Sequence, residues 1–103
     1  MRQDLEMIAD WRLETLKDLP FLRGVSWVRK PYRAYREGWD HDHCAACGIM
    51  LAEPHIKGEY VVHEGYSTTS TFVRGADYEW VCVPCFADFH EAMEWSVATE
   101  STD

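Results

Sequence analysis

The amino-acid sequence predicts a single domain of the α+β class. Apolar residues recur at helical spacing near the start of the chain and again after residue 85. Between these segments lie short runs rich in β-branched and aromatic residues, which are separated by glycines and are typical of strands. Because a chain of 103 residues buries only about 60 to 70% of the surface that its unfolded form exposes, we expect the core to need additional stabilisation.

The first third of the chain predicts a helix followed by a short strand. An amphipathic helix is expected over residues 4–19, where charged residues separate apolar ones and Pro20 ends the pattern. The apolar positions of this helix are Leu5, Ile8, Ala9, Leu16 and Leu19. A strand is predicted at residues 25–29, and residues 31–39 show no clear period, so we expect them to form an irregular connection.

The rest of the chain predicts a β-rich region and a second helix. Residues 59–64 and 78–82 are strand candidates, and residues 66–73 are a weaker third one. From Cys85 onward, one face of a predicted helix carries four apolar side chains: Phe86, Phe89, Met93 and Val97. We therefore divide the single domain, 1–103, into an N-terminal region 1–39, a region 40–97 and a frayed tail 98–103.

The first twenty residues do not predict a secretory signal, because charged residues interrupt every apolar run between Met1 and Pro20. No apolar stretch approaches the length of a membrane span. The sequence thus predicts a cytoplasmic protein without membrane contact. Cysteine thiols stay reduced in that compartment, where paired cysteines are more typical of metal ligands than of structural disulfides.

All four cysteines of the chain fall into two pairs of the form CxxC, namely Cys44-Ala-Ala-Cys47 and Cys82-Val-Pro-Cys85. A CxxC turn brings two sulfur atoms to one side of a tight loop, and two such turns supply four thiolates for a tetrahedral zinc ion at about 2.3 Å. Gly48 favours a knuckle after the first pair, because glycine adopts backbone conformations that other residues avoid. We therefore predict one structural zinc ion per chain, bound by Cys44, Cys47, Cys82 and Cys85.

Two alternatives to zinc remain open. The second cysteine pair alone is also typical of a thioredoxin-like redox site at the start of a helix. That fold requires further strands after its helix, and only residues 86–103 follow Cys85, so we do not favour it. The other alternative is a redox disulfide within each pair, without a metal.

The order of these elements resembles the treble-clef family of zinc domains. The resemblance covers residues 40–97: a CxxC turn, then strand candidates, then a CxxC whose last cysteine opens a helix. It implies that the first pair sits on a knuckle, that a β-hairpin follows with an extra loop within 67–77, and that the second pair lies in the first helical turn. The strings around His41, His63 and Trp80 are also similar to small uncharacterised bacterial zinc proteins. Neither resemblance implies a particular activity.

The histidines offer two further hypotheses. His41 and His43 precede the first cysteine, so one of them could replace a thiolate, or both could form a second metal site with Asp40 and Asp42. We favour exposed polar roles for both, because four thiolates already complete a tetrahedron. The second hypothesis concerns the HNH nucleases, a treble-clef group.

In an HNH-like metal-dependent nuclease, His63 would act as general base and His90 would help to hold a catalytic metal. The match is poor, because Val62 stands where an aspartate is expected and the chain contains no asparagine. We therefore expect both histidines to be ordinary surface or half-buried residues.

The charges are unevenly distributed along a chain whose net charge is −8. Residues 23–36 carry five basic side chains and no acidic one, interleaved with Trp27, Tyr32 and Tyr35. Residues 37–103 are strongly acidic and contain only two basic residues, Lys57 and Arg74. The basic segment therefore either binds single-stranded nucleic acid or neutralises the acidic half, and we favour neutralisation.

The aromatic residues predict both a core and a binding face. We expect Trp80, Phe86 and Phe89 inside, because a small core gains most from large apolar side chains. Trp95 lies off the predicted apolar face of the second helix and is the better interface candidate.

The function we favour is a non-enzymatic, zinc-stabilised protein-interaction module. Its acidic face would associate fastest with a basic protein, as an inhibitor or immunity-type protein would. The alternative is a nucleic-acid-binding regulator that uses residues 23–36, and the second alternative is the nuclease.

Overall fold

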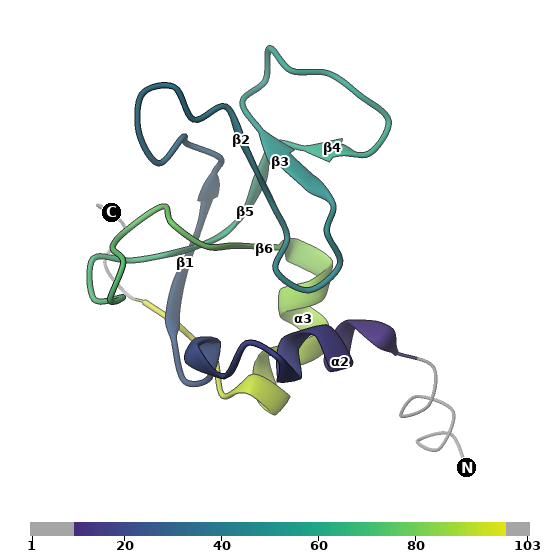
Figure 1. Ribbon diagram of the computed structural model, residues 1–103, viewed down its shortest axis with the longest axis vertical. Coiled ribbons are helices and arrows are strands. Elements are labelled where there is room, and N and C mark those ends of the chain that lie inside the picture. Colours follow the sequence, from purple (N-terminus) through teal and green to yellow (C-terminus); the bar gives the residue numbers. More distant parts are fainter. Residues whose placement is uncertain (1–9, 99–103) are drawn as a thin grey trace.

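The structure is a computed structural model that describes residues 10–98 of the chain. Within these residues it contains two α-helices, one short 3-10 helix and strands in two sheets, which confirms the α+β class. The elements in chain order are α2 (Trp11–Lys17), η1 (Pro20–Leu22), β1 (Ser26–Pro31), β2 (His41–His43), β3 (Met50–Ala52), β4 (Val61–Val62), β5 (Glu64–Thr68), β6 (Trp80–Cys82), α3 (Val83–Met93) and β7 (Ser96–Val97). Figure 1 shows the strands β2, β3 and β4 toward one end of the long axis and both α-helices toward the other.

The larger sheet has the strand order β6-β5-β1-β7. The strands β5 and β6 form the hairpin predicted between the cysteine pairs, with Gly65 opposite Cys82. Strand β1 pairs antiparallel with β5 and parallel with β7. The sequence did not predict β7, nor that β1 would join the hairpin.

The smaller sheet has the order β2-β3-β4. Strands β2 and β3 run antiparallel on either side of the first cysteine pair, whereas β4 pairs parallel with β3. An isolated bridge between Cys44 and Trp80 connects this sheet to the larger one. The first cysteine pair therefore sits where the two sheets meet.

Each helix begins at a residue that fits a helix N-terminus. Asp10 caps α2 by accepting a hydrogen bond from the Arg12 N–H. The predicted helix over 4–19 is confirmed for Trp11–Lys17, and residues 4–9 lie outside the described part of the chain. Cys82 occupies the N-cap position of α3, and Pro84 lies in the first turn, where proline needs no N–H partner.

The core lies between the larger sheet and the helices. Its fully buried large side chains include Trp27, Trp80, Leu16, Leu22, Leu51 and Val81. The predicted burial of Trp80, Phe86 and Phe89 is confirmed. All of these side chains belong to one continuous cluster that also contains three of the four cysteines.

The prediction that Trp95 is an exposed interface residue was wrong. Helix α3 ends at Met93, and Glu94 adopts a left-handed conformation with φ 60°, so the chain turns back toward the core. Trp95 is 6% exposed, its Nε1 donates to the Leu22 carbonyl at 2.8 Å, and its ring packs edge-on against Trp27. The helical period that placed Trp95 off the apolar face does not apply beyond Met93.

Three other boundaries differ from the prediction. Val97 lies in β7 and is exposed, because the helix on which it was placed ends before it. The weak strand predicted at 66–73 ends at Thr68, and residues 69–79 form the turn-rich loop expected within the hairpin. Of the predicted tail 98–103, the structure describes Ala98 alone, which donates to the Trp27 carbonyl.

Within residues 10–98, no helix has the length and apolar character required to cross a membrane.

Candidate metal centre

The first cysteine pair is held by a tight turn between β2 and β3. The Cys44 N–H donates to the Ile49 carbonyl at 2.8 Å, and the Gly48 N–H donates to the Cys44 carbonyl at 2.9 Å. Gly48 adopts φ 84°, a conformation that residues with a side chain rarely take. The turn therefore forms the knuckle that the spacing and Gly48 predicted.

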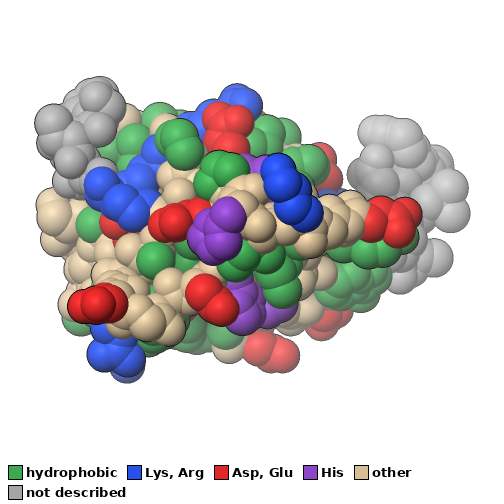
Figure 2. Space-filling model, turned by 90° about the horizontal axis from the view of Figure 1, so that it is seen from above, with side chains coloured by type: hydrophobic (Ala, Val, Ile, Leu, Met, Phe, Trp, Pro, Cys, Tyr) green, Lys and Arg blue, Asp and Glu red, His purple; other side chains and the backbone are tan. Residues whose placement is uncertain are grey.

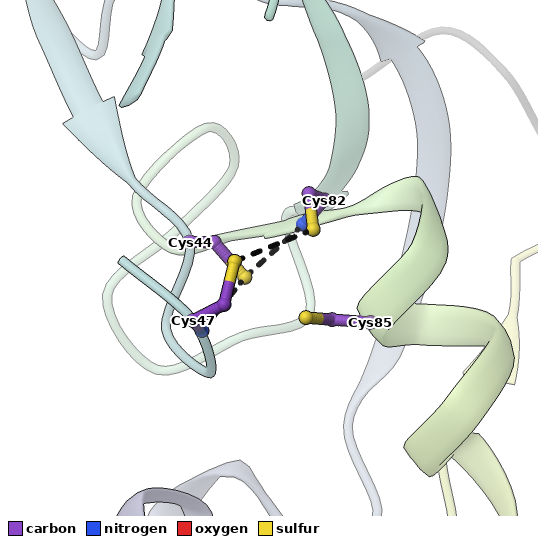
Figure 3. Close-up of side chains that lie close together, drawn as sticks. All are labelled: Cys44, Cys47, Cys82 and Cys85. Carbon is purple, nitrogen blue, oxygen red and sulfur yellow. Dashed lines mark hydrogen bonds between the residues drawn. The ribbon is translucent and has the colours of Figure 1, made fainter. Parts of the chain in front are cut away.

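The second pair lies where β6 runs into α3. Cys82 is the last residue of the strand, and Cys85 is in the first helical turn. Figure 3 shows that Cys44 and Cys47 face Cys82 and Cys85 across a small gap, so that the ligands come from two separate parts of the fold.

The four sulfur atoms lie within 4.8 Å of one another. The Cys47 and Cys82 sulfurs are 3.7 Å apart, close to the ~3.8 Å that separates two sulfurs bound at 2.3 Å to a tetrahedral ion. All four cysteines are free, and a disulfide would need an S–S distance of about 2.05 Å. Cys44, Cys82 and Cys85 are buried and Cys47 is half-buried. The geometry and the donor set fit a closed, four-coordinate metal site.

Polar hydrogen atoms point at one sulfur in particular. The Cys44 sulfur accepts from the backbone N–H groups of Ala46, Cys47 and Cys82 at 3.3 to 3.4 Å. The pKa of Cys44 lies far below its usual value, first because the Cys82 and Cys85 thiols donate to it and then because of the N–H groups of Cys47 and Cys82. Each of these two thiols is stabilised in its protonated form by its hydrogen bond to Cys44. The bond raises the pKa of Cys82 to about 12 and also raises the pKa of Cys85. Crowded thiols thus resist ionising together unless a cation offsets their charge.

Arg12 of helix α2 also contacts the cluster. Its Nη1 donates to the Cys85 sulfur at 3.4 Å, and its guanidinium lies 4.5 Å above the Phe89 ring. Asp10 and Asp88 hold the same guanidinium at 2.8 and 2.9 Å. The role of Arg12 could not be predicted from the sequence, because no spacing rule relates a charged helix residue to a cysteine so distant along the chain.

We expect Arg12→Gln to weaken metal binding about 10- to 100-fold, because groups that hydrogen-bond to metal ligands contribute on that scale. Competition with a chromophoric chelator measures the loss. Lys17→Gln is the matched control, because Lys17 belongs to the same helix and its pair with Glu14 is exposed. Equal chelator resistance in both variants would show that Arg12 does not act on the site.

The histidines beside the first cysteine are not part of the sulfur cluster. Within residues 10–98, the four cysteines are the only group of three or more potential metal ligands that lie close together. His43 Nδ1 donates to the Gly48 carbonyl at 3.0 Å, and His41 Nδ1 pairs with Asp40 at 2.6 Å. The Asp42 carboxylate accepts from the Tyr32 hydroxyl and the Trp39 indole, and burial raises its pKa.

The two histidines of the nuclease hypothesis are also not part of the sulfur cluster. His63 Nδ1 donates to the Ala52 carbonyl at 2.9 Å, and the residue borders an open groove with Arg29 and Glu64. His90, on α3, stacks on the Phe86 ring. The structure thus gives each histidine a contact with a neighbouring residue.

The basic segment 23–36 is largely engaged by carboxylates. Arg23 pairs with Glu94, and Arg29 pairs with Glu64 at 2.7 Å. Lys30 and Arg33 both pair with Asp77, whose side chain is only 10% exposed. The remaining cation of the segment, Arg36, lies over the Trp39 ring. Four of the five side chains thus contact acidic residues of the region after residue 37.

The chain matches no family model, no curated protein and no solved structure in comparisons with known proteins.

Proposed function

We propose that the four cysteines hold one structural zinc ion and that the chain is a protein-interaction module stabilised by this ion. A compact set of four sulfur donors is typical of zinc or iron–sulfur sites, and two CxxC turns with no open position are typical of structural zinc. The ion would tie the knuckle between β2 and β3 to the start of α3. It would supply the additional stabilisation that a core of this size needs.

We further propose a treble-clef-like arrangement for residues 40–97. The order of the knuckle, the β5–β6 hairpin and a helix that is capped by Cys82 supports it. Two features depart from that arrangement: β4 pairs parallel with β3, and β1 and β7 extend the hairpin into a four-stranded sheet.

The observation that carries the interaction proposal is a group of apolar side chains at the surface around η1 and the loop 69–79. Phe21 is 54% exposed and Val73 is 87% exposed, and Phe72 is half-buried beside them. Two open grooves, of about 290 and 440 Å³, share these three residues as lining. Exposed apolar groups gathered around grooves are typical of a surface that a partner covers. We call these three residues the Phe21 surface.

The charge of the chain supports a basic partner. The net charge is −8, and the basic segment is engaged by internal ion pairs. Carboxylates such as Asp18, Glu37, Glu59 and Glu91 remain exposed. Acidic surface charge accelerates encounter with a positively charged protein, so an inhibitor or immunity-type role fits this composition.

A nucleic-acid-binding regulator is the second candidate, because Arg36 and Arg74 stack over Trp39 and Tyr78 at 5.3 and 5.4 Å. Such guanidinium–aromatic pairs occur where single strands bind. The ion pairs of the other four cations of segment 23–36 weigh against it. In Figure 2, basic side chains at one end of the molecule are interspersed with acidic and histidine side chains, which does not favour a polyanion there.

An HNH-like nuclease is our last candidate. The cysteine cluster is the only group of at least three close potential ligands within the described part of the chain. His63 and His90 therefore lack a nearby set of described ligands for a second, catalytic metal.

The interaction proposal predicts that a partner recognises the Phe21 surface. Zinc-loaded full-length protein serves as bait, and bound proteins are quantified by mass spectrometry for wild type, Phe21→Ser/Val73→Ser and the matched control Tyr60→Ser. Tyr60 is 71% exposed and does not line either groove. We expect a basic protein that is retained by wild type and control but lost by the double variant.

A set of bound proteins that is identical for all three baits would contradict the interaction proposal. Oligonucleotide binding provides the competing readout. Salt-sensitive binding of a single-stranded oligonucleotide that Arg36→Gln/Arg74→Gln abolishes would favour the regulator instead.

A further inference from the structure

Strand β2 carries two histidines that face the same way. His41 and His43 are separated by one residue, and alternate residues of a strand point to the same side of its sheet. Their ring centroids lie 5.0 Å apart. The His41 side chain is 38% exposed and His43 is exposed, so both rings are accessible from solvent.

The hydrogen bonds of the two rings determine which nitrogen carries a lone pair. A backbone carbonyl only accepts, so His43 Nδ1 must donate its proton to Gly48 at 3.0 Å. The Asp40 carboxylate likewise accepts from His41 Nδ1 at 2.6 Å. In each neutral ring the lone pair is therefore on Nε2, on the side opposite the hydrogen bond.

The same pattern of hydrogen bonds occurs at metal-binding histidines. A ligating imidazole almost always donates its other ring N–H to a carboxylate or a backbone carbonyl, which fixes both the tautomer and the ring orientation. Here His41 donates to the Asp40 carboxylate, and His43 donates to the Gly48 carbonyl. Imidazole nitrogens suit Zn²⁺, Ni²⁺ and Cu²⁺ rather than Ca²⁺ or Mg²⁺.

We propose that His41 and His43 together bind one divalent transition-metal ion through their Nε2 atoms. Water completes the coordination, and the site is separate from the four cysteines. Asp40 acts as a positioning residue that holds the His41 ring, whereas Asp42 takes no part, because Tyr32 and Trp39 engage its carboxylate. With two protein ligands and an open position, the site binds more weakly than the closed sulfur site and exchanges its ion readily.

The test is calorimetric titration of Zn²⁺ into zinc-loaded full-length protein whose first zinc has been counted by elemental analysis. We expect wild type to take up one further ion per chain. His41→Gln and His43→Gln should each abolish this second event and leave the first zinc in place. The matched control is His55→Gln, which changes an exposed histidine of the loop before β4 and should retain both ions.

His43 also supports the knuckle through Gly48, so His41→Gln is the decisive variant if His43→Gln fails to fold. Asp40→Ala should weaken the second site about 10- to 100-fold while leaving the first unchanged. The inference is overturned if wild type binds no second ion, if His41→Gln still binds it with unchanged affinity, or if His55→Gln loses it as well.

Discussion

Cys82→Ser is expected to leave the chain largely unfolded. A structural zinc ion contributes about 10 to 16 kcal/mol to folding, whereas a whole domain is stable by only about 5 to 15 kcal/mol. Cys82 ends β6 and caps α3, so losing this proposed ligand would separate the knuckle from both elements. Circular dichroism during heating, together with the zinc content of the purified protein, measures the effect.

The matched control is Ala45→Ser, which introduces the same hydroxyl into the same knuckle without removing a ligand. It should retain one zinc per chain and a cooperative thermal transition. A metal-free Cys82→Ser protein that melts cooperatively near the wild-type temperature would show that the hydrophobic core suffices without the ion. Purified wild type without zinc would contradict the zinc proposal itself.

Asp77→Asn is expected to lower the free energy of unfolding by about 3 kcal/mol, because it removes a charge from a buried ion-pair network. The Asp77 and Lys30 side chains are 10% and 13% exposed, and the Ser67 hydroxyl donates to the same carboxylate. Asparagine is chosen because Asp77 has φ 64°, a conformation that asparagine tolerates. Urea unfolding monitored by tryptophan fluorescence measures the change.

The control for this variant is Glu64→Gln, which breaks the pair with Arg29, where both side chains are about half exposed. Exposed pairs contribute little, since water and salt screen them. The free energy of unfolding should therefore change far less than in Asp77→Asn. Equal changes would show that the Asp77 network is no more important than a surface pair.

The sequence was most informative where a short-range rule applies. Two CxxC spacings and Gly48 predicted the sulfur cluster and its knuckle, because both depend on the backbone geometry of a few consecutive residues. The helical period likewise predicted that Phe86 and Phe89 would lie on the buried face of α3.

Long-range contacts could not be predicted from such rules. The pairing of β1 with β7, the contact of Arg12 with Cys85 and the burial of Asp77 between Lys30 and Ser67 all join segments distant in the sequence. Trp95 shows a related failure: a left-handed residue just after the helix redirected the chain, and no periodicity predicts that turn.

The strand order has a consequence for synthesis on the ribosome. Strand β1 is translated early but lies between β5 and β7, so both of its sheet neighbours are made later. Cys44 and Cys47 likewise emerge before Cys82 and Cys85, and until then the knuckle offers an ion only two thiolates. Closure of the sulfur cluster must therefore wait until Cys85 has left the exit tunnel, and pairing of β1 on both sides must wait until β7 has followed. During that interval the first cysteine pair stays unprotected by a bound ion, and reducing conditions or a chaperone would keep its thiols from oxidising.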